Sequence, residues 1–147
     1  VSDERDDSSV RDRRTYEVYD ALSFGFDDVV LRFDERYIRE DWTETNTQDN
    51  YRIVSGIDAT FVDLISWAYP TIGAEYTFRN FQNEADFFGI ERLDRRWAGS
   101  LEFLFRDFDL FGSKVFVRYE YSDQESNIEL FNFDKHEISV GVRAITW

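Results

Sequence analysis

The chain has 147 residues, a net charge of −14 and no cysteine. The length suits one domain, and the acidic balance argues against nucleic acid as a partner, because phosphate binding needs a basic face. The absence of cysteine excludes disulfides, a thiol nucleophile and Cys-based metal sites within these residues. Aromatic residues make up 18% of the chain, yet no apolar run approaches the roughly 18 residues of a membrane helix. This balance is typical of a sheet with one apolar face bordered by aromatic residues.

Residues 1–14 are charge-dense and show no alternation of apolar and polar residues, so we expect a polar outer loop or an N-terminal tail there. From residue 15 to residue 147, period-two alternation predicts seven strands. They lie at about 15–26, 29–38, 51–61, 67–78, 96–106, 115–122 and 137–144. A strand of about ten residues can cross a bilayer when it is tilted. The fold class that we predict is therefore all-β, an antiparallel up-and-down transmembrane β-barrel.

The connections between the predicted strands alternate in length. The short ones are 27–28, 62–66 and 107–113, and the long ones are 39–50, 80–95 and 123–135. Bacterial outer-membrane barrels combine short periplasmic turns with long outer loops, and their single-chain forms have an even number of strands. Seven strands therefore indicate the C-terminal part of a larger barrel. The alternative is an eight-stranded barrel whose first strand lies near the acidic N-terminus, and the lack of alternation in residues 1–14 disfavours it.

The two faces of the predicted strands differ in chemistry. One face is apolar except at Asp20 and Glu35, and we expect it to contact lipid; its clearest members are Leu101, Phe103, Phe105, Val117, Tyr119, Ile138, Val140 and Val142. The other face mixes charges with small residues such as Gly56 and Gly73, and we expect it to line a lumen. Its predicted lumen-lining residues are Arg52, Asp58, Glu75, Arg96, Glu102, Arg106, Arg118, Glu120 and Arg143.

Acids and arginines that alternate on neighbouring strands predict cross-strand ion pairs. Glu102 with Arg118, or Glu120 with Arg143, are the pairs that we expect. The same alternation also fits a soluble barrel in which the apolar face points inward and the polar face meets water. The small residues on the polar face favour the lumen, because glycine weakens a strand and a solvated face gains nothing from it.

The last hairpin carries a specific pattern. Ser126-Asn127 is followed by Phe-Asn-Phe-Asp-Lys at 131–135 and Ser-Val-Gly-Val at 139–142. This pattern resembles the last hairpin of Gram-negative outer-membrane barrels found with exopolysaccharide export systems and with tetratricopeptide-repeat secretion proteins. The resemblance covers about the last thirty residues. It departs from the family at Trp147, which has the parity of Arg143 rather than of Val142.

The resemblance implies a location in the bacterial outer membrane. It also implies contact with outer-membrane lipid and lipopolysaccharide, with the barrel-assembly machinery through the C-terminal strand, and with other secretion or envelope proteins. The function that we predict is a porin-like pore or secretion channel for polar solutes or polysaccharide. One alternative is a small closed structural or adhesive barrel, plugged by its own charge pairs. Another is a soluble β-barrel that binds an apolar ligand.

Residues that would carry catalysis are sparse. The one histidine, His136, lies at the start of the last predicted strand, and Ser139 faces the other side of that strand. No HExxH motif, Gly-rich phosphate loop or Cys/His metal spacing occurs. We therefore expect no enzyme activity, no cofactor and no metal, and we assign Glu75, Glu102 and Glu120 to the lumen wall rather than to a glycosidase.

Overall fold

A computed structural model of the chain describes residues 13–42, 49–84, 88–110 and 112–144. The prediction for residues 1–14 therefore lies almost wholly outside the described part. The described residues form seven strands and one 3-10 turn. The strands are β1 (Arg13–Phe26), β2 (Val29–Trp42), β3 (Asn50–Phe61), β4 (Ala68–Glu84), β5 (Glu91–Leu110), β6 (Ser113–Ser126) and β7 (Phe133–Ala144), and the turn η2 is Glu129–Phe131.

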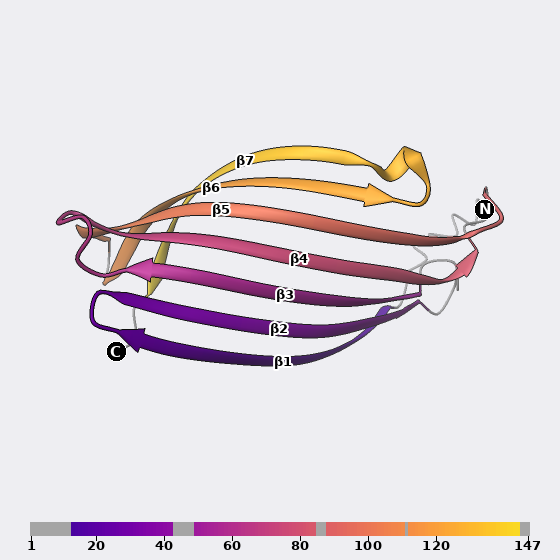
Figure 1. Ribbon diagram of the computed structural model, residues 1–147, viewed down its shortest axis with the longest axis horizontal. Helices are drawn as coiled ribbons and strands as arrows, with labels where there is room; N and C mark the ends of the chain where they lie inside the picture. Colours follow the sequence, from indigo (N-terminus) through magenta and orange to yellow (C-terminus); the bar gives the residue numbers. More distant parts are fainter. Residues whose placement is uncertain (1–12, 43–48, 85–87, 111, 145–147) are drawn as a thin grey trace, which may run out of the picture.

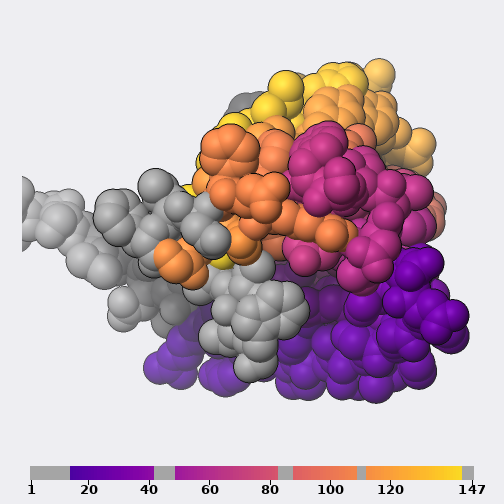
Figure 2. Space-filling model, turned by 90° about the vertical axis from the view of Figure 1, so that its left-hand side faces the viewer, coloured from indigo at the N-terminus to yellow at the C-terminus, as the bar shows by residue number. Residues whose placement is uncertain are grey.

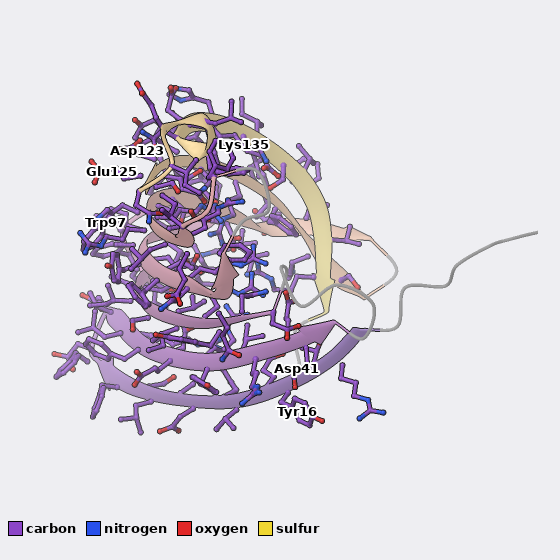
Figure 3. The ribbon with its side chains drawn as sticks, turned by 90° about the vertical axis from the view of Figure 1, so that its right-hand side faces the viewer. Tyr16, Asp41, Trp97, Asp123, Glu125 and Lys135 are labelled. Carbon is purple, nitrogen blue, oxygen red and sulfur yellow. The ribbon has the colours of Figure 1, made fainter. Side chains whose placement is uncertain are left out.

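The seven strands form one sheet in which each strand pairs antiparallel with the next along the chain. This up-and-down order confirms the predicted all-β antiparallel fold and the predicted number of strands. The strands lie side by side along the long axis of the molecule (Figure 1), and the sheet curls about that axis (Figure 3). The sheet is not closed, because β1 and β7 are its two edges.

The predicted alternation of short and long connections holds only in part, because the β3–β4 connection, residues 62–67, is as long as the connections at 85–90 and 127–132. Two connections are short. Asp27 and Asp28 join β1 to β2, and residues 111–112 join β5 to β6, where Gly112 has a φ of +80° that favours glycine. These short turns lie at one end of the sheet (Figure 1). Viewed from that end, the β1–β2 hairpin lies along one side of the molecule and the strands β5 to β7 lie along the other (Figure 2). We call the two ends of the sheet the turn end and the loop end.

Several strands are longer than the sequence predicted. The strand β2 continues to Trp42, β4 to Glu84, β5 to Leu110 and β6 to Ser126, and β5 and β7 begin at Glu91 and Phe133. The predicted loops 39–50, 80–95, 107–113 and 123–135 were therefore too long. Polar residues ended the apolar alternation there, but a backbone ladder pairs polar and apolar residues equally well. Arg39 pairs with Tyr51, for example, within the β2–β3 ladder.

The apolar core is small for a chain of this length. Within the described residues, the buried hydrophobic side chains are Ile38, Val54, Ala68, Phe81 and Ile128. Most of the other large apolar side chains are exposed, including Val18, Leu22, Phe24, Ile138 and Val140. No helix in the described ranges combines the length and the apolar character that crossing a membrane would require.

Candidate functional site

The register of the sheet assigns each strand residue to one of two faces, because successive side chains alternate. On one face lies a hollow of about 770 Å³, lined by side chains from all seven strands, among them Glu17 on β1, Asp58 on β3 and Arg143 on β7. Only the inner side of a curled sheet can gather side chains from both edges in this way. We call it the concave face and its opposite the convex face.

The predicted lumen-lining residues share the concave face. By register these are Arg52, Asp58, Glu75, Arg96, Glu102, Arg118, Glu120 and Arg143. Arg106 lies outside the paired register and joins this face through its contact with the ring of Tyr69. The predicted lipid-facing residues share the convex face, and they are Leu101, Phe103, Phe105, Val117, Tyr119, Ile138, Val140 and Val142. In a soluble domain the apolar side chains are buried and the charged ones are exposed. Here the exposure is reversed, since Val140 is 70% exposed and Glu102 is 4% exposed.

Ion pairs cross the middle of the concave face. Both guanidinium nitrogens of Arg143 donate to the carboxylate of Glu102, at 2.6 and 2.9 Å. Arg96 and Arg118 donate to the two oxygens of Glu120, at 2.7 and 3.0 Å. Bidentate and shared pairs of this kind hold long side chains in defined positions.

These pairs correct the sequence prediction. Glu102 and Arg118 are register partners, but each bonds elsewhere, and Arg143 bonds Glu102 instead of Glu120. The reason is the curl of the sheet. Curvature brings the concave side chains of β5 and β7 toward each other, so the guanidinium of Arg143 reaches across β6.

The loop end of the concave face is packed. Arg79 donates to Asn50 at 2.9 Å and to Glu40 at 3.3 Å, and Asn50 and Glu40 are buried. Arg92 forms an ion pair with Asp94 at 2.6 Å. The Arg92 guanidinium also lies over two aromatic rings, at 4.7 Å from the centroid of Phe81 and 3.4 Å from that of Phe131. Cations over ring faces in a desolvated setting are held firmly, so this loop-end cluster fills the concave face at that end.

The turn end of the concave face carries a smaller contact. The guanidinium of Arg106 lies 4.3 Å from the ring centroid of Tyr69 and 3.3 Å from a carboxylate oxygen of Asp63. Arg36 lies 4.0 Å from Glu75 nearer the middle. The hollow lies between the loop-end cluster and the turn end, and among its charged side chains Arg36, Glu102, Arg118 and Arg143 are in ion pairs.

Two glycines leave room for carboxylates on this face. A Cβ atom at Gly56 would lie 2.9 Å from an oxygen of Asp34, and one at Gly73 would lie 2.3 Å from an oxygen of Asp58. Each carboxylate therefore leans across the neighbouring strand at the point where that strand has no side chain. This close approach explains why two strand interiors contain glycine, which otherwise weakens a strand.

The convex face carries aromatic and polar residues near its loop end. The Tyr119 hydroxyl and His136 Nδ1 lie 2.7 Å apart, and the His136 ring packs 4.8 Å from the ring of Tyr121. His136 thus lies on the convex face, away from Ser139, as the sequence indicated. Beyond the apolar rows, Arg39 donates to Asp41 at 2.9 Å, and this hydrogen bond raises the pKa of the guanidinium.

Sequence reasoning missed part of the concave face. Glu40, Asn50, Arg92 and Asp94 fell within predicted loops, and no pattern in the sequence links them. Asp34 could have been found, because its neighbours Phe33 and Glu35 belong to the predicted apolar face and alternation places Asp34 opposite. Across the described ranges, no three Asp, Glu or His side chains gather as metal ligands.

Comparisons with protein-family models, with curated proteins and with solved structures find no match to this chain.

Proposed function

We propose that this chain forms part of the wall of a bacterial outer-membrane β-barrel that acts as a pore or secretion channel for polar solutes. The observation that carries the proposal is the inverted distribution of side chains. The convex face exposes an apolar surface that spans all seven strands and is interrupted at Asp20, Glu35 and Ser55, and the concave face holds charges around a hollow. A soluble ligand-binding barrel has the opposite arrangement, since its apolar face points inward.

The size of the exposed apolar surface supports a lipid environment. Contiguous apolar patches on soluble monomers rarely exceed a few hundred Å². Here exposed apolar side chains occur on the convex face from β1 to β7, including Leu22, Phe33, Ile57, Ile72 and Val140. Hydrocarbon covers such a surface without any further protein partner.

Aromatic residues on the convex face form a diagonal band. Asp20, Glu35, Ser55, Tyr76, Trp97, Asp123 and Asp134 form one row of the register. Relative to this row, Tyr16 lies four residues toward the loop end, Tyr37 two residues toward the loop end, and Tyr121 two residues toward the turn end. Figure 3 shows Tyr16 and Trp97 on the outer side of the curve.

The slope of this band matches a tilted barrel wall. Between Tyr16 on β1 and Tyr121 on β6 the band shifts by six residues toward the turn end. The two strands are five strand positions apart in the sheet. Strands about 4.8 Å apart that tilt by 35–45° shift a level line by about 1.0–1.4 residues per strand. The band is therefore level when the wall is tilted as in a barrel, and Tyr and Trp at one level are the girdle of a membrane interface.

The direction of the edge strands indicates how the wall is completed. Odd-numbered strands of an up-and-down sheet run in one direction, so β1 and β7 are parallel to each other. Antiparallel closure therefore needs an odd number of further strands between these two edges. We infer that other strands of the full-length protein supply them, which agrees with the expectation of a larger barrel.

Planar-bilayer recordings of the full-length protein test the channel. Purified protein folded in detergent is added to a lipid bilayer in 1 M KCl, and stepwise conductance increments are expected. A heat-denatured sample is the matched control. A folded protein that inserts into bilayers, shown by flotation with vesicles, and yet carries no current would contradict the channel.

One observation favours a closed structural or adhesive barrel as the second candidate. The loop-end cluster around Arg92 and Asp94 is packed and buried, and small barrels fill their interior with side chains. The same recordings separate the two candidates, because a closed barrel inserts without conducting.

A further inference from the structure

The charges on the concave face are unequally paired. Arg143, Arg96 and Arg118 each donate to a carboxylate within 3.0 Å. By contrast, among the residues that the structure describes, neither Asp34 nor Asp58 accepts a hydrogen bond or lies within ion-pair distance of a basic group. The unmatched charge at the middle of the hollow is therefore negative.

The lining of the hollow gives the same result. The main hollow and a smaller neighbour of about 180 Å³ are lined together by six carboxylates and four guanidiniums. The carboxylates belong to Glu17, Asp34, Asp58, Glu75, Glu102 and Glu120, and the guanidiniums to Arg32, Arg36, Arg118 and Arg143. Arg32 donates to the hydroxyl of Tyr19 rather than to a carboxylate. A fifth guanidinium, that of Arg96, donates to Glu120 at 2.7 Å. The mid-lumen charge is thus one unit more negative than positive.

The backbone holds the two unpaired carboxylates in place. Asp34 leans from β2 over Gly56 of β3, and Asp58 leans from β3 over Gly73 of β4. Both carboxylates border the main hollow as well as the smaller one. Because glycine is what admits them, their position is a property of the wall and not of a mobile side chain at a loop.

We propose that Asp34 and Asp58 form a charge filter that makes the lumen selective for cations and positively charged solutes. This inference rests on the proposed channel. An unpaired carboxylate within about 5 Å of a passing ion in a water-like medium changes the ratio of cation to anion permeability by about two- to fivefold, less at high salt. Two such groups are expected to act in the same direction.

The experiment measures reversal potentials of the full-length protein in planar bilayers under a tenfold KCl gradient. Wild type is expected to favour potassium over chloride. The variant Asp34→Asn/Asp58→Asn keeps side-chain size and removes both charges, and its permeability ratio is expected to fall at least about fourfold toward one. Asp41→Asn is the matched control, because Asp41 is bonded to Arg39 at the end of the convex face, and it should leave the ratio unchanged.

A second measurement does not depend on the variant folding. Raising the mean KCl concentration from 0.1 to 1 M shortens the Debye length from about 10 to about 3 Å, so the wild-type ratio is expected to decline toward one. A current that is unselective or favours chloride would overturn the filter and leave the channel intact. An unchanged ratio in the double variant would overturn the assignment to these two residues. Absence of any current would instead overturn the channel itself.

Discussion

Replacing Val140 with arginine separates a lipid-facing convex face from a solvated one. Val140 is 70% exposed on β7, so a larger side chain meets no packed neighbours and overpacking contributes nothing. Val140 lies four residues along β7 from His136, and His136 packs against Tyr121 of the aromatic band. A tilted strand rises about 2.6 Å per residue along the membrane normal, which places Val140 about 10 Å below that band, near the middle of an apolar belt about 25 Å tall.

The expected cost follows from that depth. Arginine at the bilayer midplane destabilises a barrel by about 2–4 kcal/mol, so we expect Val140→Arg to lower the free energy of unfolding by about 2–3 kcal/mol. The same change at an exposed position in water would stay within about 0.5 kcal/mol. The assay is reversible urea unfolding of the protein in lipid vesicles, followed by tryptophan fluorescence.

Leu130→Arg is the matched control. Leu130 is 75% exposed, like Val140, but it lies in the η2 turn between β6 and β7. It should be outside the hydrocarbon, so its replacement should change the free energy of unfolding by less than about 0.5 kcal/mol. Equal effects of the two substitutions would refute the reasoning, because exposure alone would then account for both.

Three further predictions concern the two faces. Glu102→Gln removes the charge to which Arg143 donates two hydrogen bonds, and it should lower the free energy of unfolding by about 1–2 kcal/mol in the same assay. The control Glu137→Gln, in an exposed ion pair with Lys135, should change it little, and equal losses would show that the Glu102 pair does not stabilise the fold. Gly73→Ala should lower the free energy of unfolding by about 1 kcal/mol because the new Cβ meets the side chains of Asp58 and Ser100, whereas Gly25→Ala, with nothing within 4 Å, should be neutral or slightly stabilising. An unchanged free energy of unfolding in Gly73→Ala would contradict the close approach of Asp58. Asp20→Leu should raise stability in vesicles by about 1–2 kcal/mol, because Asp20 lies four residues below Tyr16 on the apolar face; a loss of stability would mean that this position does not face hydrocarbon.

Alternation along the strands predicted much of the fold. The long period-two runs on β1, β3 and β6 placed those strands to within one or two residues at most ends, because one face of each strand is mostly apolar. The order of the sheet followed from the hairpin connections, since short connections join neighbours in an antiparallel sheet. Where charged residues dominate both faces, as at 91–95, alternation disappears and the strand could not be recognised.

The sequence predicted which face of the sheet carries the charged residues, but not which of them bond to each other. Alternation assigned Arg118 and Glu102 to one side, but it could not choose their partners, because the choice depends on the curl of the sheet. The bond from Arg143 to Glu102 skips a strand, and no pairing rule for adjacent strands contains such a contact. Glu40 and Asn50 were missed for a similar reason, since they are buried where Arg79 of β4 reaches across β3 to both of them.

Site-directed spin labelling of β6 tests the central claim most directly. The 147 residues contain no cysteine, so single cysteines at each position from 115 to 121 can be labelled one at a time in protein reconstituted into vesicles. Labels at Val117 and Tyr119 should relax with oxygen, which partitions into hydrocarbon, and labels at Phe116 and Arg118 should relax with a water-soluble nickel complex. The reverse order, or access of the nickel complex to all seven positions, would contradict a convex face in lipid.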